Sequence, residues 1–180
     1  ILLHVPFDGW SQVSFAAACQ DCDIDVSIAS IQCPRGALDL AVMFHQAGDQ
    51  AMQRQLDDMD LSGLKFREKV TAAVRARIEV IADKEAVRRG STLFSLPQNA
   101  IEGAGLIWGT SDAIWTHLGD TSADVNWYTK RASLSAVYGA CILYWLGDDS
   151  PDHAATWDFL DRRIKNVMQF EKAKAEINKN

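Results

Sequence analysis

Three of the four cysteines lie close together in the sequence. Cys19 and Cys22 form a Cys-x-x-Cys motif, and Cys33 follows eleven residues later. This spacing could supply three zinc ligands or a redox pair. Cys141 is distant, and no histidine stands at ligand spacing near the first three. We therefore favour free, buried thiols over a metal site, and thiols of this kind indicate a reducing compartment.

No arrangement of acids, histidines or nucleophiles predicts catalysis. A di-iron carboxylate bundle needs Glu-x-x-His pairs, and none of the six glutamates has a histidine three residues on. Walker A, G-x-S-x-G, H-E-x-x-H and Rossmann glycine patterns do not occur. Asp112, between Trp108 and Trp115, is the one candidate acid, because burial there would favour its protonated form. A capped or exposed aspartate is commoner, so we expect a binding protein and no enzyme activity.

An aromatic pair and a basic pair follow one another at the start of a predicted helix. Trp127-Tyr128 come after the turn-rich sequence GDTSADVN, and Lys130-Arg131 come next. Exposed aromatic side chains beside a cation are typical of a binding hot spot. Alternatively, both rings pack back under the preceding helix as a hydrophobic staple. Residue types alone favour the staple.

Composition and charge indicate an ordinary globular chain. It has 180 residues, 48% of them hydrophobic and 23% charged, which is enough for a sizeable core. The net charge of -6 argues against nucleic acid as the main partner. The longest uncharged run, 132–147, is shorter than the roughly 20 apolar residues of a membrane span. The sequence begins at Ile1 rather than Met, and we recognise no signal or transit peptide in it.

The apolar residues repeat with helical spacing nearly throughout, and alternating strand-like runs are absent, so we predict an all-α fold. The helix over 98–118 contains Gly103, Gly105 and Gly109, which together cost about 3 kcal/mol of helix propensity. Close helix packing, a bend or space for a ligand would offset that cost. The helix over 125–146 is apolar on all sides and should be central. The expected helices cover residues 11–22, one short segment in 24–31, 35–57, 64–82, 84–96, 98–118, 125–146 and 151–170.

Two stretches carry a resemblance to a known family. They are IWGTSDAIW at 107–115 and LGDTSADVNWYTKRASLSAVYGACILYWLGDDSPDHAATWDFLDRRI at 118–164. Together they resemble the coenzyme Q nine family of ubiquinone biosynthesis. The similarity is dense over 100–172 and looser upstream, where it includes VPFDGWS, PRGALDLAVMFH, LKFREKV and VRRGSTLFSLPQNA.

The resemblance implies a TetR-like helical fold that forms a homodimer. It implies a non-enzymatic accessory protein that binds isoprenoid quinone lipids and presents them to the di-iron demethoxyubiquinone hydroxylase. No cofactor of its own is implied, and the missing Glu-x-x-His pairs fit this division, since the oxidation belongs to the partner. On this basis we expect a degenerate helix-turn-helix-like segment over 1–58. A lipid-binding and dimerisation domain would cover 59–180.

The resemblance also assigns candidate site residues. Carried over position by position, the surface for the hydroxylase comprises Ile114, Trp115, Leu118, Asp124, Trp127, Tyr128 and Arg131. For the lipid pocket we rely on the helical pattern, which selects Phe94, Ile101, Leu106, Trp108, Tyr138, Ile142 and Trp145. With these assignments, our interpretation of Trp127 and Tyr128 moves from the staple to a docking surface.

Two departures from the family pattern matter. Only eleven residues, 23–33, separate Cys22 from Pro34, which leaves room for one short helix and disfavours a DNA-binding helix-turn-helix. The alternative function is a TetR-like, ligand-responsive transcription regulator, and this departure counts against it. Eukaryotic members of the family continue into an amphipathic, membrane-binding helix, whereas this sequence ends at KAEINKN. Either that helix was lost or lies outside this sequence, or the chain resembles a bacterial member that contacts the membrane in another way. We expect a protein that is cytoplasmic or peripheral at the inner membrane, with the mitochondrial matrix side as the location in eukaryotic relatives.

Overall fold

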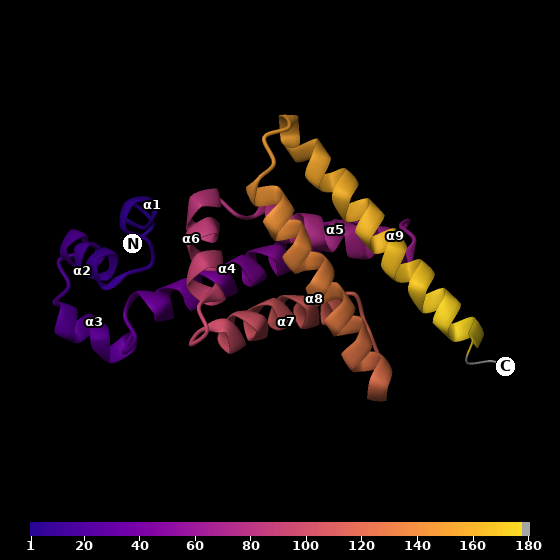
Figure 1. The fold of residues 1–180 in the computed structure, drawn as a ribbon, viewed down its shortest axis with the longest axis horizontal. Helices are drawn as coiled ribbons and strands as arrows, with labels where there is room; N and C mark the ends of the chain where they lie inside the picture. Colours follow the sequence, from indigo (N-terminus) through magenta and orange to yellow (C-terminus); the bar gives the residue numbers. More distant parts are fainter. Residues whose placement is uncertain (178–180) are drawn as a thin grey trace. The chain divides into compact units, whose positions relative to one another are not determined.

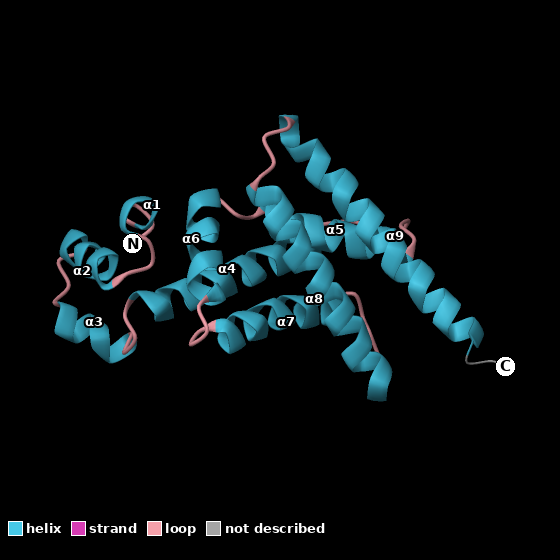
Figure 2. Cartoon of the chain, viewed as in Figure 1, coloured by secondary structure: helices cyan, strands magenta, loops and turns pink. Residues whose placement is uncertain are grey.

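The computed structural model describes the backbone of residues 1–177 and the side chains of residues 1–167 and 169. In this part, the chain forms nine α-helices and one short 3-10 helix without any strand, so the predicted all-α class is confirmed (Figure 2). None of these helices combines the length and the apolar character needed to cross a membrane. The elements are α1 (Val5–Asp8), α2 (Gln12–Asp21), α3 (Val26–Gln32), α4 (Ala37–Asp57), α5 (Phe66–Glu79), α6 (Lys84–Ser95), α7 (Ala100–His117), α8 (Asp124–Leu146), η1 (Pro151–His153) and α9 (Ala154–Ile177) (Figure 1).

The segment between Cys22 and Pro34 contains the single short helix that its length predicts. This is α3, and its first turn is capped by Asp25, whose carboxylate accepts a hydrogen bond from the Ser27 N–H at 2.8 Å. A side-chain oxygen at this position satisfies an N–H that helical bonding leaves without a partner.

The chain divides into two compact units, and each is assembled from two separate segments. Unit 1 comprises residues 1–50 and 81–106, and unit 2 comprises 51–80 and 107–180. The division expected from the resemblance, at residue 58, would place each domain in one continuous segment. The units differ from that expectation because α6 packs against α1, so a segment from the middle of the chain completes the N-terminal core.

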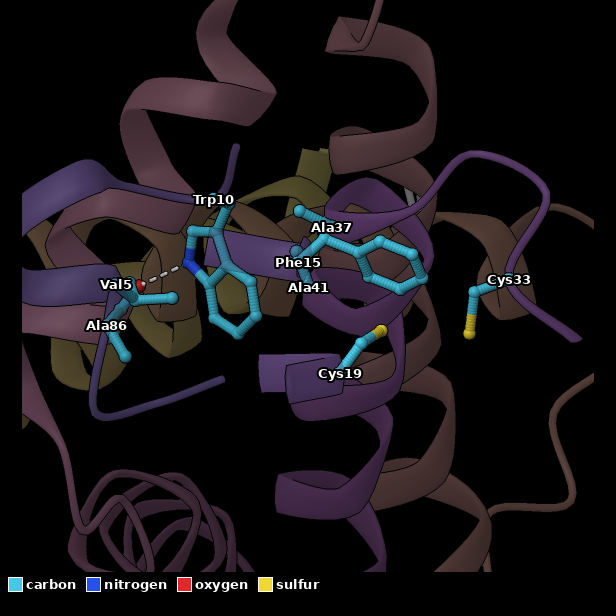
Figure 3. Close-up of a cluster of buried hydrophobic side chains, with 8 residues drawn as sticks. All are labelled: Val5, Trp10, Phe15, Cys19, Cys33, Ala37, Ala41 and Ala86. Atoms are coloured by element: carbon cyan, nitrogen blue, oxygen red, sulfur yellow. Dashed lines mark hydrogen bonds between the residues drawn. The ribbon is translucent and has the colours of Figure 1, made fainter. Parts of the chain in front are cut away.

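Unit 1 is built around a small apolar core. Trp10 is buried there, and its indole N–H donates to the Ala86 carbonyl of α6 at 3.0 Å (Figure 3). The Trp10 and Phe44 rings lie 5.6 Å apart. Cys19 and Cys33 are also members of this core, and both are free thiols. The buried members are Val5, Trp10, Phe15, Cys19, Cys33, Ala37, Ala41 and Ala86 (Figure 3).

Unit 2 is organised by α5, α8 and α9, with α9 packed on both of the others. Leu160 and Ile164 of α9 are buried, as are Val74 and Ile78 of α5. The helix α8 is buried along one face only, because Leu143 and Tyr144 are 67% and 40% exposed. The sequence pattern predicted a central helix, and the structure leaves one face of it exposed.

Candidate functional site

Three aromatic rings meet where the middle of α7 faces the start of α8. The ring centroids of Trp108 and Trp127 are 5.9 Å apart, and those of Trp108 and Tyr128 are 6.5 Å apart. Trp127 and Tyr128 are in edge contact at 4.8 Å. We call Trp108, Trp127 and Tyr128 the aromatic cluster. Tyr128 is 63% exposed and neighbouring Val125 is 70% exposed, so the cluster presents apolar surface to solvent.

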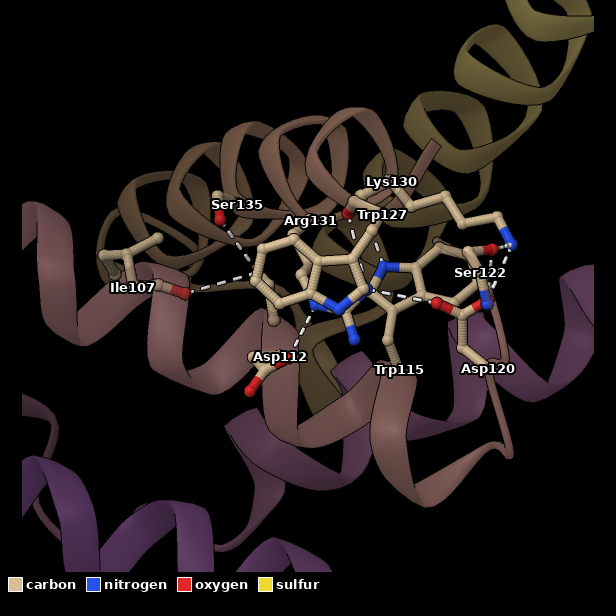
Figure 4. A network of polar contacts seen from close by, with 10 residues as sticks. Ile107, Asp112, Trp115, Asp120, Ser122, Trp127, Lys130, Arg131 and Ser135 are labelled. Carbon is tan, nitrogen blue, oxygen red and sulfur yellow. Dashed lines mark hydrogen bonds and ion pairs between the residues drawn. The ribbon is translucent and has the colours of Figure 1, made fainter. Parts of the chain in front are cut away.

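Beneath the aromatic cluster lies a buried cation. Arg131 is only 2% exposed, and its guanidinium carbon lies 4.1 Å from the centroid of the Trp127 ring (Figure 4). Its Nε donates to the Asp112 carboxylate at 2.5 Å, and its Nη1 donates to Asp120 at 3.1 Å and to the Trp127 carbonyl at 3.3 Å. A buried arginine is stable when its donors are paired in this way.

Asp120 ties the loop before α8 to the helix itself. Its carboxylate accepts hydrogen bonds from Lys130 Nζ at 2.7 Å and from the Ser122 hydroxyl at 2.7 Å (Figure 4). Burial acts to raise the pKa of Asp120, but the hydrogen bonds from Lys130, Ser122 and Arg131 outweigh it and hold the pKa well below its usual range. Asp120 is therefore ionised at neutral pH. We call Asp112, Asp120, Ser122, Lys130 and Arg131 the Arg131 network.

Each ring of the aromatic pair fits a different one of the two alternatives, the staple and the docking surface. Trp127 is half-buried against Trp108 of the preceding helix and against Arg131, as the staple alternative predicts. Tyr128 stays largely exposed, as the docking alternative predicts. Within the pair, Trp127 packs against neighbouring side chains, and Tyr128, which contacts it, is exposed.

The predicted partner surface is only partly at the surface. Asp124 and Tyr128 are exposed, and Leu118 and Trp127 are half-buried. Ile114, Trp115 and Arg131 are 0%, 7% and 2% exposed, so their assignment as contact residues is corrected.

Ring packing and a hydrogen bond explain why Trp115 is buried. Trp115 stacks on Phe66 of α5 at 5.4 Å, and its indole N–H donates to the Lys130 carbonyl at 3.2 Å. These contacts hold the surface in place from below. Sequence reasoning named Asp112 only as a candidate catalytic acid and missed its pairing with Arg131, and it missed Asp120 altogether. The spacing of four from Trp108 to Asp112, repeated from Trp127 to Arg131, was the available signal.

The predicted lipid-pocket residues fall in both units. In unit 2, Tyr138, Ile142 and Trp145 are buried and share one face of α8, while Trp108 belongs to the aromatic cluster. In unit 1, Phe94 and Leu106 are half-buried. Ile101 is 89% exposed, so its assignment to an enclosed wall is wrong. The pocket itself stays a prediction for the remaining six residues.

The interior of unit 2 also contains polar groups that are paired with one another. The Arg77 guanidinium lies 5.8 Å from the centroid of the Tyr138 ring, and both residues are 2% exposed. The Ser135 hydroxyl donates to the Ser111 hydroxyl at 3.0 Å. An apolar interior with a few fixed polar groups is typical of sites for small amphipathic molecules.

An open hollow between α5 and α9 differs from the predicted pocket in character. Its lining is dominated by charged side chains, so it does not offer the apolar wall that a lipid tail needs. The lining residues are Arg67, Glu68, Thr71, Ala72, Arg75, Asp161, Arg162 and Lys165.

The candidate acid Asp112 is not buried. Its side chain is 43% exposed and forms an ion pair with Arg131 at 2.5 Å. The proposed catalytic role required a desolvated carboxyl group, and this geometry does not provide one. In the described part of the chain, no three His, Cys, Asp or Glu side chains are grouped so that they could hold a metal ion.

Comparison with known proteins identifies the segment that carries the aromatic cluster. Residues 100–171 match the COQ9 family. A protein of Dictyostelium discoideum, named "Probable ubiquinone biosynthesis protein coq9, mitochondrial", is 31% identical over 98% of this chain and 60% of its own length. The proteins named "Ubiquinone biosynthesis protein COQ9, mitochondrial" from Xenopus tropicalis and Homo sapiens are 32% and 30% identical, over 93% of this chain and 55% of their own lengths.

The chain thus spans little more than half the length of the curated relatives it matches. The matched domain, 100–171, contains the whole aromatic cluster and the Arg131 network. Residues 100–171 therefore form a COQ9 family domain, and the chain is similar to curated COQ9 proteins along nearly its full sequence.

Proposed function

We propose that this protein is a non-enzymatic accessory factor of ubiquinone biosynthesis. It binds isoprenoid quinone intermediates and presents them to the demethoxyubiquinone hydroxylase. The COQ9 family domain supports the pathway, since the relatives are named as ubiquinone biosynthesis proteins. The single observation that carries the docking role is the exposed ring of Tyr128, supported by Trp127 and Trp108.

The support beneath this surface favours binding. An aromatic side chain that is already fixed loses little conformational freedom when a partner covers it. Trp127 is fixed by Arg131, and Arg131 is fixed by Asp112 and Asp120. Aromatic anchors of this kind supply most of the binding energy at protein interfaces.

The interior of unit 2 is the region to which we assign the lipid in that unit. An isoprenoid quinone combines a long apolar tail with a ring that bears oxygen acceptors. The buried face of α8, with Tyr138 and Ile142, suits the apolar part. Arg77 and Tyr138 add polar groups to this interior, where both are buried.

We also propose a TetR-like arrangement and a homodimer. The exposed face of α8 supports the dimer, because it carries Ala132, Ala136 and Leu143 and no charged residue occurs between 132 and 147. Small residues of this kind allow a second helix to approach closely. A quinone lipid resides in a membrane and the relatives are named as mitochondrial proteins, so we place the protein at the surface of the inner membrane.

The docking role is tested by measuring the affinity of the purified chain for purified demethoxyubiquinone hydroxylase. We expect Tyr128→Ala to weaken binding by about tenfold or more, since a buried aromatic anchor contributes over 1 kcal/mol. Tyr144→Ala is the matched control, because it removes the same side chain from the other end of α8, where it is 40% exposed. Equal affinities for Tyr128→Ala and the unmodified chain would remove the assigned surface.

The lipid role is tested separately on the same preparations. Organic extraction of the purified protein, followed by mass spectrometry, should detect a long-chain lipid or uptake of an added isoprenoid quinone. Tyr128→Ala should leave this uptake unchanged, since Tyr128 lies at the surface. Failure of the unmodified chain to retain or take up lipid would end the lipid-binding part of the proposal.

A further inference from the structure

The short helix α3 presents an apolar stripe to solvent. Ile28 and Ile31 are three residues apart in α3, which places them on one side of the helix, and Ile24 lies directly before the capping residue Asp25. Ile24, Ile28 and Ile31 are 47%, 62% and 74% exposed, and α3 contains no buried residue. Such stripes normally face the core of their own domain. Here the three isoleucines, which we call the isoleucine stripe, face outward.

Unit 1 does not need the isoleucine stripe to hold α3. The helix is capped by Asp25 at its start, and Cys33, directly after its end, is buried in the unit 1 core. α3 also lies beside α2, against which it packs (Figure 1). The isoleucine stripe is therefore apolar surface that stays exposed in the folded unit.

The surroundings of the isoleucine stripe are acidic. Residues 1–34 contain no lysine or arginine, and Asp21, Asp23 and Asp25 lie within five residues at the start of the stripe. Asp25 accepts hydrogen bonds from Ser27, which lower its pKa and keep it ionised. Asp21 contacts His4 at 2.6 Å. All three aspartates are exposed.

The nearest cation along the chain does not neutralise this charge. Arg35 is paired with Asp39 at 2.6 Å and with Glu102 at 2.8 Å. The end of α3 is therefore no more basic than its start. An exposed apolar stripe flanked by acidic side chains is complementary to an apolar face flanked by basic ones.

We infer that the isoleucine stripe and Asp21, Asp23 and Asp25 form a docking face for a basic amphipathic helix of a partner protein. The apolar side of the partner covers Ile28 and Ile31, and its lysines or arginines pair with the aspartates. Phosphate-rich nucleic acids and anionic lipid surfaces are repelled by the same aspartates. This face lies in unit 1 and shares no residue with the aromatic cluster, so it does not depend on the proposed hydroxylase contact.

The test uses the full chain and a fluorescent, amphipathic peptide of about 14 residues made of leucine and lysine, long enough to cover a stripe of two turns. Fluorescence anisotropy should show binding that weakens as salt rises. Ile28→Ser combined with Ile31→Ser should weaken it by about tenfold or more. Asp23→Asn combined with Asp21→Asn should weaken it several-fold and reduce its salt dependence. A leucine and glutamate peptide of the same pattern should not bind.

Two matched controls distinguish binding at this face from nonspecific binding elsewhere on the chain. Met43→Ser removes an exposed apolar side chain, 55% exposed, from α4 of the same unit. Asp58→Asn removes one exposed negative charge elsewhere. Both should bind the leucine and lysine peptide like the unmodified chain. Circular dichroism should show unchanged helix content in every variant, and the aspartate variants test the face even if the isoleucine variants unfold.

Three results would overturn the inference. Equal affinity of the peptide for all variants would show that the isoleucine stripe and the three aspartates do not form its docking face. Binding to neutral phosphatidylcholine vesicles that is lost on Ile28→Ser and Ile31→Ser assigns the stripe to a membrane instead. Concentration-dependent self-association that disappears in the same variants assigns it to a second copy of this chain.

Discussion

The guanidinium of Arg131 lies 4.1 Å from the centroid of the Trp127 ring, while its Nη1 donates to the carbonyl of the same residue at 3.3 Å. The two residues are four apart on α8, so one turn of helix presents the ring to the cation. Through Asp112, the same cation is tied to α7. The orientation of Trp127 therefore depends on charges that lie beneath the surface.

Replacement of Arg131 by lysine should destabilise unit 2 and weaken hydroxylase binding. Lysine keeps the charge but cannot contact Asp112, Asp120 and the Trp127 ring at once, so we expect a loss of about 2 kcal/mol in the free energy of unfolding. Urea denaturation measures this loss. Arg163→Lys is the matched control, because Arg163 is exposed and lies 4.8 Å over the Phe159 ring; its effect should stay within about 0.5 kcal/mol. Similar losses in both variants would contradict the supporting role of Arg131.

Asp120→Asn should remove a pH-dependent part of the stability. The folded pKa of Asp120 is below its unfolded value, because hydrogen bonds from Lys130, Ser122 and Arg131 overcome the effect of burial. Its contribution is therefore fully present above the unfolded value of about 3.9 and is lost as pH falls toward the folded value. The free energies of unfolding of the two proteins should differ by a constant amount from pH 7 to about 5 and converge below about pH 4. Asp149→Asn, at an exposed position, should show no such convergence.

Two glycines of the same helix should respond in opposite ways to alanine. At Gly103 an added Cβ would lie 2.7 Å from the Cβ of Phe94, so Gly103→Ala should cost about 1–3 kcal/mol in the free energy of unfolding. At Gly105 nothing lies within 4 Å, so Gly105→Ala should stabilise the protein by up to about 1 kcal/mol. Thermal unfolding of both variants measures the contrast. Loss of stability at both positions would show that Gly105 is also needed for a close contact.

The cysteines should differ strongly in reactivity. Cys141 is buried, and burial raises the pKa of its thiol to about 11. At pH 8 only about one part in a thousand of such a thiol is ionised, so alkylation should be slow. Cys22 is exposed and should react first with iodoacetamide at this pH. Mass spectrometry of partially labelled protein identifies the order, and unfolded protein, in which all four cysteines should react, is the control. Early labelling of Cys141 would show that unit 2 opens readily.

Local features of the chain were predictable because they depend on near neighbours. The helical spacing of apolar residues sufficed for the all-α class, and the eleven residues between Cys22 and Pro34 sufficed for a single short α3. The close packing expected for the glycines of the helix over 98–118 is present at Gly103, which faces Phe94. The motifs over 107–164 were specific enough for the family, which the comparison confirmed.

The outward or inward direction of side chains was not predictable in the same way. Ile114, Trp115 and Tyr128 all lie in the similar segment, yet the first two are buried and the third is exposed. Ile101 and Ile114 are on the same helix and differ from 89% to 0% exposed. A helix with a broad apolar face does not reveal which part of that face another segment will cover.

The aromatic pair shows what the sequence alone determines and what only the tertiary structure determines. Residue order alone placed Trp127 and Tyr128 at the start of a helix beside two cations. Only the tertiary structure determines that Arg131 points inward and pairs with Asp112 and Asp120. It also determines that Trp127 packs on Arg131 and that Tyr128 is exposed. The reason is that burial and ion pairing depend on segments distant in sequence, whereas helix formation depends on the residues of one turn.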